Sequence, residues 1–482
     1  MFSDDKFLHI SGKIILCKPS KNLLIIGVSE NEKTLILRRF LFMKKKCLAV
    51  LMTAATVVSS MGFGTVAMAE GNDGDEKYED TVTLSLLVDQ NWLETYGDAL
   101  QALSDATLEK YNIEIELENK TNGSEGDNIV KTRLAAGEMT DLLIFNSGAQ
   151  FSALNPEEYF LDLTDYDFMD NVNDIFKQAV TVDEKVYGTP VSSSNVGGIV
   201  YNKKVYEELG LEIPKTWDQF ISNMEACEEA GYTGILGTCG DSWSSQYTLL
   251  ADYYNVQAQE PDFASEFEAG TAKFETVPAA LRSWEKLSDL QNHMNEDYMA
   301  TTVTDGFDYM MEEGGTVHWP MTSQYFSYID MMYSKEDADN FGIFPIPGDD
   351  ENDNGFTVWM PNGLYINKDS GNVDAAVTFM KFWASEEGMD VFMENASADG
   401  PYLINGVELP EDSYQGVLDL QSYFDEGKTA LALEFLTALK GASCDQICVE
   451  CISGAMSAEE AAKVYDEDCQ KMAQQLGLKG WE

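Results

Sequence analysis

Three cysteines near the C-terminal end have the spacing closest to that of a known cofactor site. Cys444, Cys448 and Cys451 form Cys-x3-Cys-x2-Cys, the pattern with which radical enzymes bind an iron–sulfur cluster. These positions are also i, i+4 and i+7 and share one face of a helix, so burial or disulfide pairing explains them as well. A cluster needs a reducing compartment, which the export signal described below disfavours. We therefore predict no cofactor.

Disulfides are the other chemical use of these thiols. Six of the eight cysteines follow residue 69, an even number that suits an oxidising compartment. Six cysteines allow fifteen pairings, and the sequence does not choose among them. The six are Cys227, Cys239, Cys444, Cys448, Cys451 and Cys469.

The remaining residue types offer little for catalysis or metal binding. Only three histidines are present, so His-based metal sites and Ser-His-Asp chemistry have little material, and we expect His318 to be a structural neighbour of a binding site. Residues 349–353 could coordinate calcium, although we favour a solvated acidic loop. With 83 carboxylates, no pair stands out as the acid and nucleophile of a glycosidase. No metal site is predicted.

Tryptophans in expected loops, beside amide and hydroxyl side chains, form a pattern that suits a carbohydrate. Sugars have apolar ring faces and hydroxyl rims, so their sites combine aromatic rings with short polar groups. For each single tryptophan, core packing is an equally good explanation. The candidates of this kind are Gln90, Asn91, Trp92, Trp243, Trp319, Ser323, Gln324 and Trp359.

Alternating strands and helices are expected to position such residues. The pattern predicts strands at 81–88 and 113–117 and helices at 92–111 and 129–136. A short apolar strand at 141–145 then leads into the polar residues Asn146, Ser147 and Gln150. This alternation indicates a parallel sheet, and loops beyond the carboxyl ends of its strands form the usual ligand site.

Residues 43–69 are predicted to be a secretory signal peptide. Three lysines precede an apolar run at 48–58, and Ala-Met-Ala at 67–69 suits cleavage. The run is too short for a membrane span, and Cys47 precedes it, so no lipid-anchor cysteine is found. The simplest explanation of residues 1–42 is a mis-annotated upstream extension, with translation starting at Met43. We expect a secreted or extracytoplasmic protein, at the cell surface or in a periplasm, whose mode of attachment stays open.

The charge excludes several classes of partner. A formal net charge of −52 repels nucleic acid and anionic membranes and disfavours a strongly anionic ligand, but permits a cationic one. The acid accompanies 44% hydrophobic residues, so the chain has a core and is not a disordered polymer. Its length favours two large lobes.

Residues 186–220 carry the most informative local pattern. A strand is followed by the segment 192–198, which lacks bulky side chains and suits a hinge between two rigid bodies. A second strand at 199–201 precedes a helix that starts at Trp217, where Thr216 and Gln219 form a capping box.

The motifs of this segment, in this order, resemble those of the family 1 extracellular solute-binding proteins of ABC importers. They are Tyr187-Gly188-x-Pro190, Tyr201-Asn202-Lys203 and Pro214-x-Thr216-Trp217-x-x-Phe220. The resemblance continues through the strand at 141–145, the segments 314–321 and 341–347, the helix at 372–385 and the helix that Ser457 and Glu460 cap. It spans most of residues 80–482.

This resemblance implies a periplasmic-binding-protein-like α/β fold, with two lobes joined by several hinge crossings around a ligand cleft. We expect the N-terminal lobe at 80–191 and 346–398 and the C-terminal lobe at 192–345 and 399–482. Asn195 falls where the family places a polar ligand contact. The family function would be capture of a mono- or oligosaccharide by a monomer, without catalysis, and delivery to the permease subunits of an ABC importer.

Two alternatives stay open. The same fold binds many solutes, so a polyol or polyamine could replace the sugar. A secreted carbohydrate-active enzyme is the second alternative.

Overall fold

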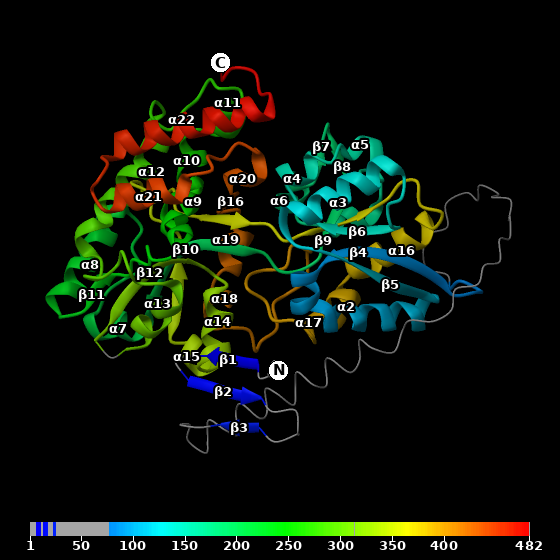
Figure 1. Ribbon diagram of the computed structural model, residues 1–482, viewed down its shortest axis with the longest axis horizontal. Coiled ribbons are helices and arrows are strands. Elements are labelled where there is room, and N and C mark those ends of the chain that lie inside the picture. The colour runs from blue at the N-terminus through cyan, green and yellow to red at the C-terminus, as the bar shows by residue number, and fades with distance from the viewer. Residues whose placement is uncertain (1–5, 11–12, 18–22, 26–76, 313, 482) are drawn as a thin grey trace, which may run out of the picture. The chain divides into compact units, whose positions relative to one another are not determined.

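The computed structural model describes residues 6–10, 13–17, 23–25, 77–312 and 314–481 (Figure 1). The chain divides into two units, residues 1–70 and 71–482. The first contains an antiparallel sheet of β1 (Lys6–Ile10), β2 (Lys13–Cys17) and β3 (Leu23–Ile25). The predicted signal peptide at 43–69, with Cys47, lies outside the described residues. In the described part, no helix is both long and apolar enough to span a membrane.

The first sheet of the second unit has the predicted parallel core. Its strand order is β5-β4-β6-β15-β9, with β4 parallel to β5 and β6, and β15 antiparallel to β6 and β9. Helices α2 and α17 lie on one side of this sheet and α3 on the other (Figure 1). The strands are β4 (Val82–Asp89), β5 (Ile113–Lys120), β6 (Leu142–Phe145), β9 (Gly188–Pro190) and β15 (Gly363–Ile366).

The helices that accompany this sheet confirm the predicted pattern, although α3 begins six residues earlier than expected. They are α2 (Gln90–Tyr111), α3 (Gly123–Ala136), α4 (Ala149–Ser152), α5 (Pro156–Tyr159), α6 (Asp174–Ala179), α16 (Val373–Trp383) and α17 (Glu386–Met393). A hairpin of β7 (Thr181–Val182) and β8 (Lys185–Val186) precedes β9.

The second sheet is organised around one long strand, β10 (Asn195–Asn202). Its order is β11-β12-β10-β14-β16, and β13 pairs with β10 next to β14. Strands β12, β13 and β14 all run antiparallel to β10. The other strands are β11 (Thr233–Ile235), β12 (Thr316–Thr322), β13 (Phe341–Phe344), β14 (Phe356–Trp359) and β16 (Thr429–Leu431).

Most helices of this second lobe come from residues 203–338 and from the C-terminal segment. The longer ones are α7 (Lys203–Leu209), α8 (Trp217–Glu229), α10 (Tyr253–Gln259), α12 (Pro278–Asp289), α13 (Val303–Met311), α14 (Tyr325–Met332), α21 (Cys444–Ile452) and α22 (Ala458–Leu476). The shorter ones are α9 (Tyr247–Ala251), α11 (Phe263–Glu268), α15 (Lys335–Ala338), α18 (Gln415–Leu418), α19 (Gln421–Asp425) and α20 (Leu433–Leu436).

The connections between the two sheets correct one detail of the expected lobes. Within residues 77–481 the chain passes between the sheets three times: after β9, between β14 and β15, and before β16. Strand β14 was assigned to the N-terminal lobe, whereas it pairs with β10 and β16 of the second sheet. The apolar run after residue 341 therefore returns to the first sheet at 360–362 rather than at 346.

Local capping residues define two helices as predicted. The Thr216 side chain accepts a hydrogen bond from the Gln219 N–H (3.3 Å), and the Gln219 side chain accepts one from the Lys215 N–H (2.8 Å). Ser457 accepts the N–H of Glu460 (3.2 Å) at the start of α22. Such caps satisfy backbone groups that the first helical turn leaves unpaired.

A buried ion pair connects α12 to the turn before α10. Lys286 Nζ donates to Asp252 Oδ1 (2.7 Å) and to the Pro347 carbonyl (2.8 Å), and both charged side chains are 1% exposed. Ser283 and Asn255 donate further hydrogen bonds to the Asp252 carboxylate. A charge pair at this depth is tolerated because each charged atom has hydrogen-bond partners.

Candidate ligand cleft between the lobes

The start of β10 brings together polar groups from three segments. Asn195 lies opposite Trp359 in the pairing of β10 with β14. Ser323 Oγ accepts the Val196 N–H (3.0 Å) and donates to Asn195 Oδ1 (3.4 Å). Gln324 follows Ser323 directly before α14, with its side chain half-buried. Asn195 thus lies where the first crossing enters the second sheet, with Trp359 and Ser323 beside it.

Trp359 is held in place by a glycine and a carboxylate. A Cβ at Gly197 would lie 2.5 Å from the Trp359 ring, so the ring packs directly on the β10 backbone. The indole Nε1 donates to Glu434 Oε1 of α20 (2.9 Å), and Lys440 Nζ lies 3.8 Å from Glu434 Oε2. A half-buried ring next to an acceptor of this kind suits a ligand with an apolar face and hydroxyls.

Trp243 and Tyr247 add a second aromatic pair. Trp243 is 46% exposed and packs edge-on against Tyr247 with ring centroids 5.8 Å apart. Burial, together with the smaller effect of the charges of Tyr328 and Glu434, raises the pKa of the Tyr247 phenol to about 12. Tyr247 therefore lies within electrostatic range of the Trp359–Glu434 pair and of α14, and Trp243 neighbours it.

Asp399 is a carboxylate at the meeting point of both lobes. Its N–H donates to Ser193 Oγ (3.0 Å) in the first crossing. Burial raises the pKa of Asp399, while a hydrogen bond with Ser327 of α14 opposes the rise. Within the described residues Asp399 forms no ion pair. The Tyr96 phenol of α2, whose pKa burial raises to about 12, is also affected by the Asp399 charge.

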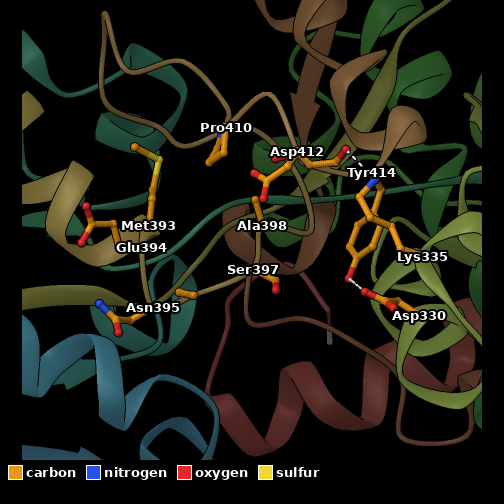
Figure 2. A pocket seen from close by; sticks show the side chains of 12 residues that line it. Asp330, Lys335, Met393, Glu394, Asn395, Ser397, Ala398, Pro410, Asp412 and Tyr414 are labelled. Atoms are coloured by element: carbon orange, nitrogen blue, oxygen red, sulfur yellow. Dashed lines mark hydrogen bonds between the residues drawn. The ribbon is translucent and has the colours of Figure 1, made fainter.

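A polar pocket of about 430 Å³ is lined in part by residues 396–398, which directly precede Asp399 in the chain (Figure 2). Figure 2 shows Met393, Glu394 and Asn395, at the end of α17, on the side opposite Asp330 and Lys335 of α14 and α15. Residues of both lobes therefore line it. Tyr414 lies on the side of Asp330 and Lys335 and donates to Asp330 Oδ2 (2.9 Å). The other lining residues are Ala396, Ser397, Ala398, Pro410, Asp412 and Ser413.

The polar residues predicted after β4 and β6 lie in the first lobe, at the carboxyl ends of these strands. Asn146 Nδ2 donates to Gln150 Oε1 (2.6 Å), with Gln150 exposed. Ser147 is buried and donates to the Pro361 carbonyl (2.9 Å), so its hydroxyl ties the loop to the second crossing. Gln90 and Asn91 are exposed in the first turn of α2, where Gln90 Nε2 donates to Glu94 (3.0 Å).

Two predicted platform tryptophans belong to the core instead. Trp319 lies inside β12, is 1% exposed and packs edge-on against Phe307 and Tyr325. Trp92 is 8% exposed and packs against Tyr96 and Trp383. Neither ring has a free face for a ligand, so the stacking role expected of Trp92 and Trp319 is wrong.

Several cleft residues were not predicted from the sequence. Glu434, Asp399 and Tyr328 lie far apart in the chain and outside any tryptophan-containing loop. Glu434 and Asp399 were hidden among 83 carboxylates. Only Tyr247 could have been found from its sequence neighbours, because it directly follows the Ser-Trp-Ser-Ser-Gln segment that contains Trp243.

The cysteines and the acidic loop, which were candidates for disulfide and metal chemistry, have structural roles in the described residues. All six described cysteines are free and buried, so of the two explanations left open by the sequence the structure has burial. Among the described residues no group of three or more His, Cys, Asp or Glu is arranged to hold a metal. Asp349 of the acidic loop is engaged by Arg282, whose Nε donates to it (2.9 Å).

His318 is a core residue. It is completely buried, with Nε2 2.7 Å from the Tyr206 hydroxyl and Nδ1 2.6 Å from the Gly234 carbonyl. Burial lowers its pKa to about 4, while the hydrogen bond to Gly234 opposes the fall.

Comparison with known proteins decides the family. Residues 102–413 match the bacterial extracellular solute-binding proteins. The chain belongs to this family. Membership confirms the resemblance found in the sequence, and it implies an extracytoplasmic location. The fold agrees, since each sheet is the centre of one α/β lobe.

The relatives include proteins named for sugars. The multiple sugar-binding protein of Streptococcus mutans is 32% identical over 147 residues, or 29% of this chain and 35% of that protein. The uncharacterized ABC transporter extracellular-binding protein of Pyrococcus horikoshii is 23% identical over 335 residues, covering 69% of this chain and 76% of that protein. The melibiose/raffinose/stachyose-binding protein MelE of Bacillus subtilis is 26% identical over 31% of this chain and 34% of its own length. Two of these matches thus span about a third of the relative.

Solved structures share the fold over nearly the whole second unit. The apo form of RafE from Streptococcus pneumoniae has a TM-score of 0.68 at 18% identity and covers 83% of this chain and 100% of its own. RafE in complex with raffinose has a TM-score of 0.61 at 20% identity, with 82% and 100% covered. At these identities the likeness shows the fold alone.

Proposed function

We propose that the protein captures a carbohydrate, a mono- or oligosaccharide, between its lobes and delivers it to the permease subunits of an ABC importer. One observation carries the proposal: Trp359, Glu434 and Asn195 meet where the first crossing enters the second sheet, with Trp243 and Tyr247 nearby. Aromatic faces beside carboxylate and amide groups match the two surfaces of a sugar ring. The relatives named for sugars support the ligand class.

The three crossings supply the mechanism. A ligand that touches both lobes favours the closed form by the difference between its affinities for the closed and open forms. The importer then distinguishes the closed receptor from the open one. In this proposal binding energy serves recognition, and the protein carries out no catalysis and works as a monomer.

The site residues we propose combine predicted and newly found side chains. Trp243, Trp359 and Tyr247 would provide ring faces, and the polar groups would bind hydroxyls as donors and acceptors. The proposed polar contacts are Gln90, Asn91, Asn146, Gln150, Asn195, Gln324, Asp399 and Glu434.

Calorimetry with raffinose and stachyose, the sugars named for relatives and neighbours, tests the proposal. We expect binding by the wild type, and a loss of about 1 to 3 kcal/mol for Trp243→Ala or Trp359→Ala. Leu476→Ala, an exposed apolar residue at the end of α22, is the matched control and should bind as the wild type does. Unchanged affinity in both tryptophan variants would contradict the assigned platform.

A cationic ligand is the second candidate, because Asp399 has no ion-pair partner in the described residues. A thermal-shift screen should therefore include a polyamine and a polyol beside the sugars, since binding to the native state raises its stability. Stabilisation by the polyamine alone would replace the carbohydrate proposal. A sugar-release assay with the same panel tests for hydrolysis, which we expect to be absent.

A further inference from the structure

Every serine of the turn that carries Trp243 donates side-chain hydrogen bonds that hold the turn in place. It forms the 3-10 helix η2, Ser242–Gln246. Ser244 Oγ donates to the carbonyls of Thr238 and Asp241 (both 2.9 Å). Ser245 Oγ donates to the Ser242 carbonyl (2.6 Å). These hydroxyls are used to hold the turn, and the exposed group it presents is the Trp243 ring.

A second anchor comes from the other end of the chain. Asp445, in the first turn of α21, accepts a hydrogen bond from Ser242 Oγ at Oδ2 (2.6 Å). The backbone carbonyl of the same residue accepts one from Ser245 Oγ (3.0 Å). The Asp445 contacts thus lie on both sides of Trp243. The Ser242 hydrogen bond lowers the pKa of Asp445, so the anchor is a charged acceptor, and such hydrogen bonds are the stronger ones.

Helix α21 is itself held in place by its three buried cysteines. Cys444, Cys448 and Cys451 are buried in one apolar cluster with Trp284 of α12 and Cys469 of α22. These small side chains let α21 pack closely on both helices. The triplet therefore fixes the helix from which Asp445 reaches the Trp243 turn.

We propose that Asp445 is a positioning residue, which holds the Trp243 ring in the orientation needed to stack on the ligand. This rests on the proposed function, because it takes Trp243 as a ligand platform. A ring that is ordered before binding loses less conformational entropy on binding, so the anchor raises affinity without touching the ligand.

Asp445→Ala tests the anchor, with two readouts. Trp243 is the most exposed of the eight tryptophans, so acrylamide quenching, compared with that of Trp243→Phe, isolates its signal, and acrylamide is neutral towards the acidic surface. We expect Asp445→Ala to give Trp243 a faster time-resolved anisotropy decay and to weaken raffinose binding at least tenfold. Asp445→Asn keeps an acceptor oxygen and should stay within threefold of the wild type.

Asp174→Ala is the control, because it removes a first-turn carboxylate from α6, a helix of the first lobe. If Asp445→Ala matches Asp174→Ala in both anisotropy and affinity, the inference is overturned. If Asp445→Ala does not fold, Ser242→Ala removes the same hydrogen bond from the exposed side and must give the same two effects. A wild type that binds no sugar would contradict the proposed function, while the anisotropy comparison would still decide whether Asp445 orders Trp243.

Discussion

Gly148 offers a direct test of contact between the lobes. It lies between β6 and α4 of the first lobe with φ +72° and ψ −145°, a backbone conformation that only glycine adopts easily. A Cβ placed on it would lie 2.7 Å from Phe435 Cα and 2.8 Å from Phe435 Cβ. Phe435 belongs to α20, whose neighbouring residue Glu434 holds Trp359. Gly148→Ala should therefore force α20 away from the first lobe, next to the candidate site.

The size of the effect has two parts. The backbone strain alone costs about 1 to 3 kcal/mol of folding stability. The methyl group adds a clash with backbone rather than with a movable side-chain end, so the lobes cannot keep this contact. Gly137→Ala is the control for an alanine at positive φ (+67°) without a clash, because nothing lies within 4 Å of its added Cβ.

Two measurements check the prediction. Calorimetry with raffinose should show an affinity loss of at least tenfold for Gly148→Ala and little change for Gly137→Ala. Hydrogen exchange should show faster exchange in segments 146–150 and 432–436 for Gly148→Ala alone. Equal affinity and equal exchange in the two variants would refute the reasoning that the lobes touch here beside the candidate site.

Three further outcomes follow from buried groups. Lys286→Met should lower the free energy of unfolding in urea by about 3 to 5 kcal/mol, because it leaves Asp252 charged and unpaired, and a loss below 1 kcal/mol would contradict this. Burial holds the pKa of His318 at about 4, whereas a histidine in the unfolded chain has a pKa near 6.5. Between these pH values the unfolded state binds more protons than the folded state, so the free energy of unfolding should fall by about 3 kcal/mol as the pH drops from 6.5 to 4. His318→Gln should lose that part of the pH dependence, and equal slopes would argue against it. The six buried thiols should react with iodoacetamide only after unfolding, as mass spectrometry would show.

Local sequence signals predicted the elements better than they predicted the site. The cap of Thr216 on α8 depends on neighbours three residues apart, so the sequence contains it completely. Trp319 was expected in a loop beside polar residues, whereas it lies in β12, which is buried throughout. The neighbouring residue Pro320 pairs with Ile199 of β10. A strand of this kind shows no alternation between polar and apolar residues.

The carboxylates of the site depended on tertiary structure. Glu434 and Trp359 are 75 residues apart and meet only because β16 pairs in parallel with β14. Asp399 reaches the first crossing because Tyr402 bridges to Ser193. Nothing near either residue in the sequence distinguishes it from the other acidic residues, so pairing of distant strands had to be known first.

The six unpaired thiols bear on how the chain matures after export. Each of the six described cysteines is unpaired and packed in the interior, so the part of the chain that the structure describes contains no disulfide that has to form during folding. A cysteine engineered on an exposed face of this part of the chain would therefore be more accessible to a thiol label than any of these six.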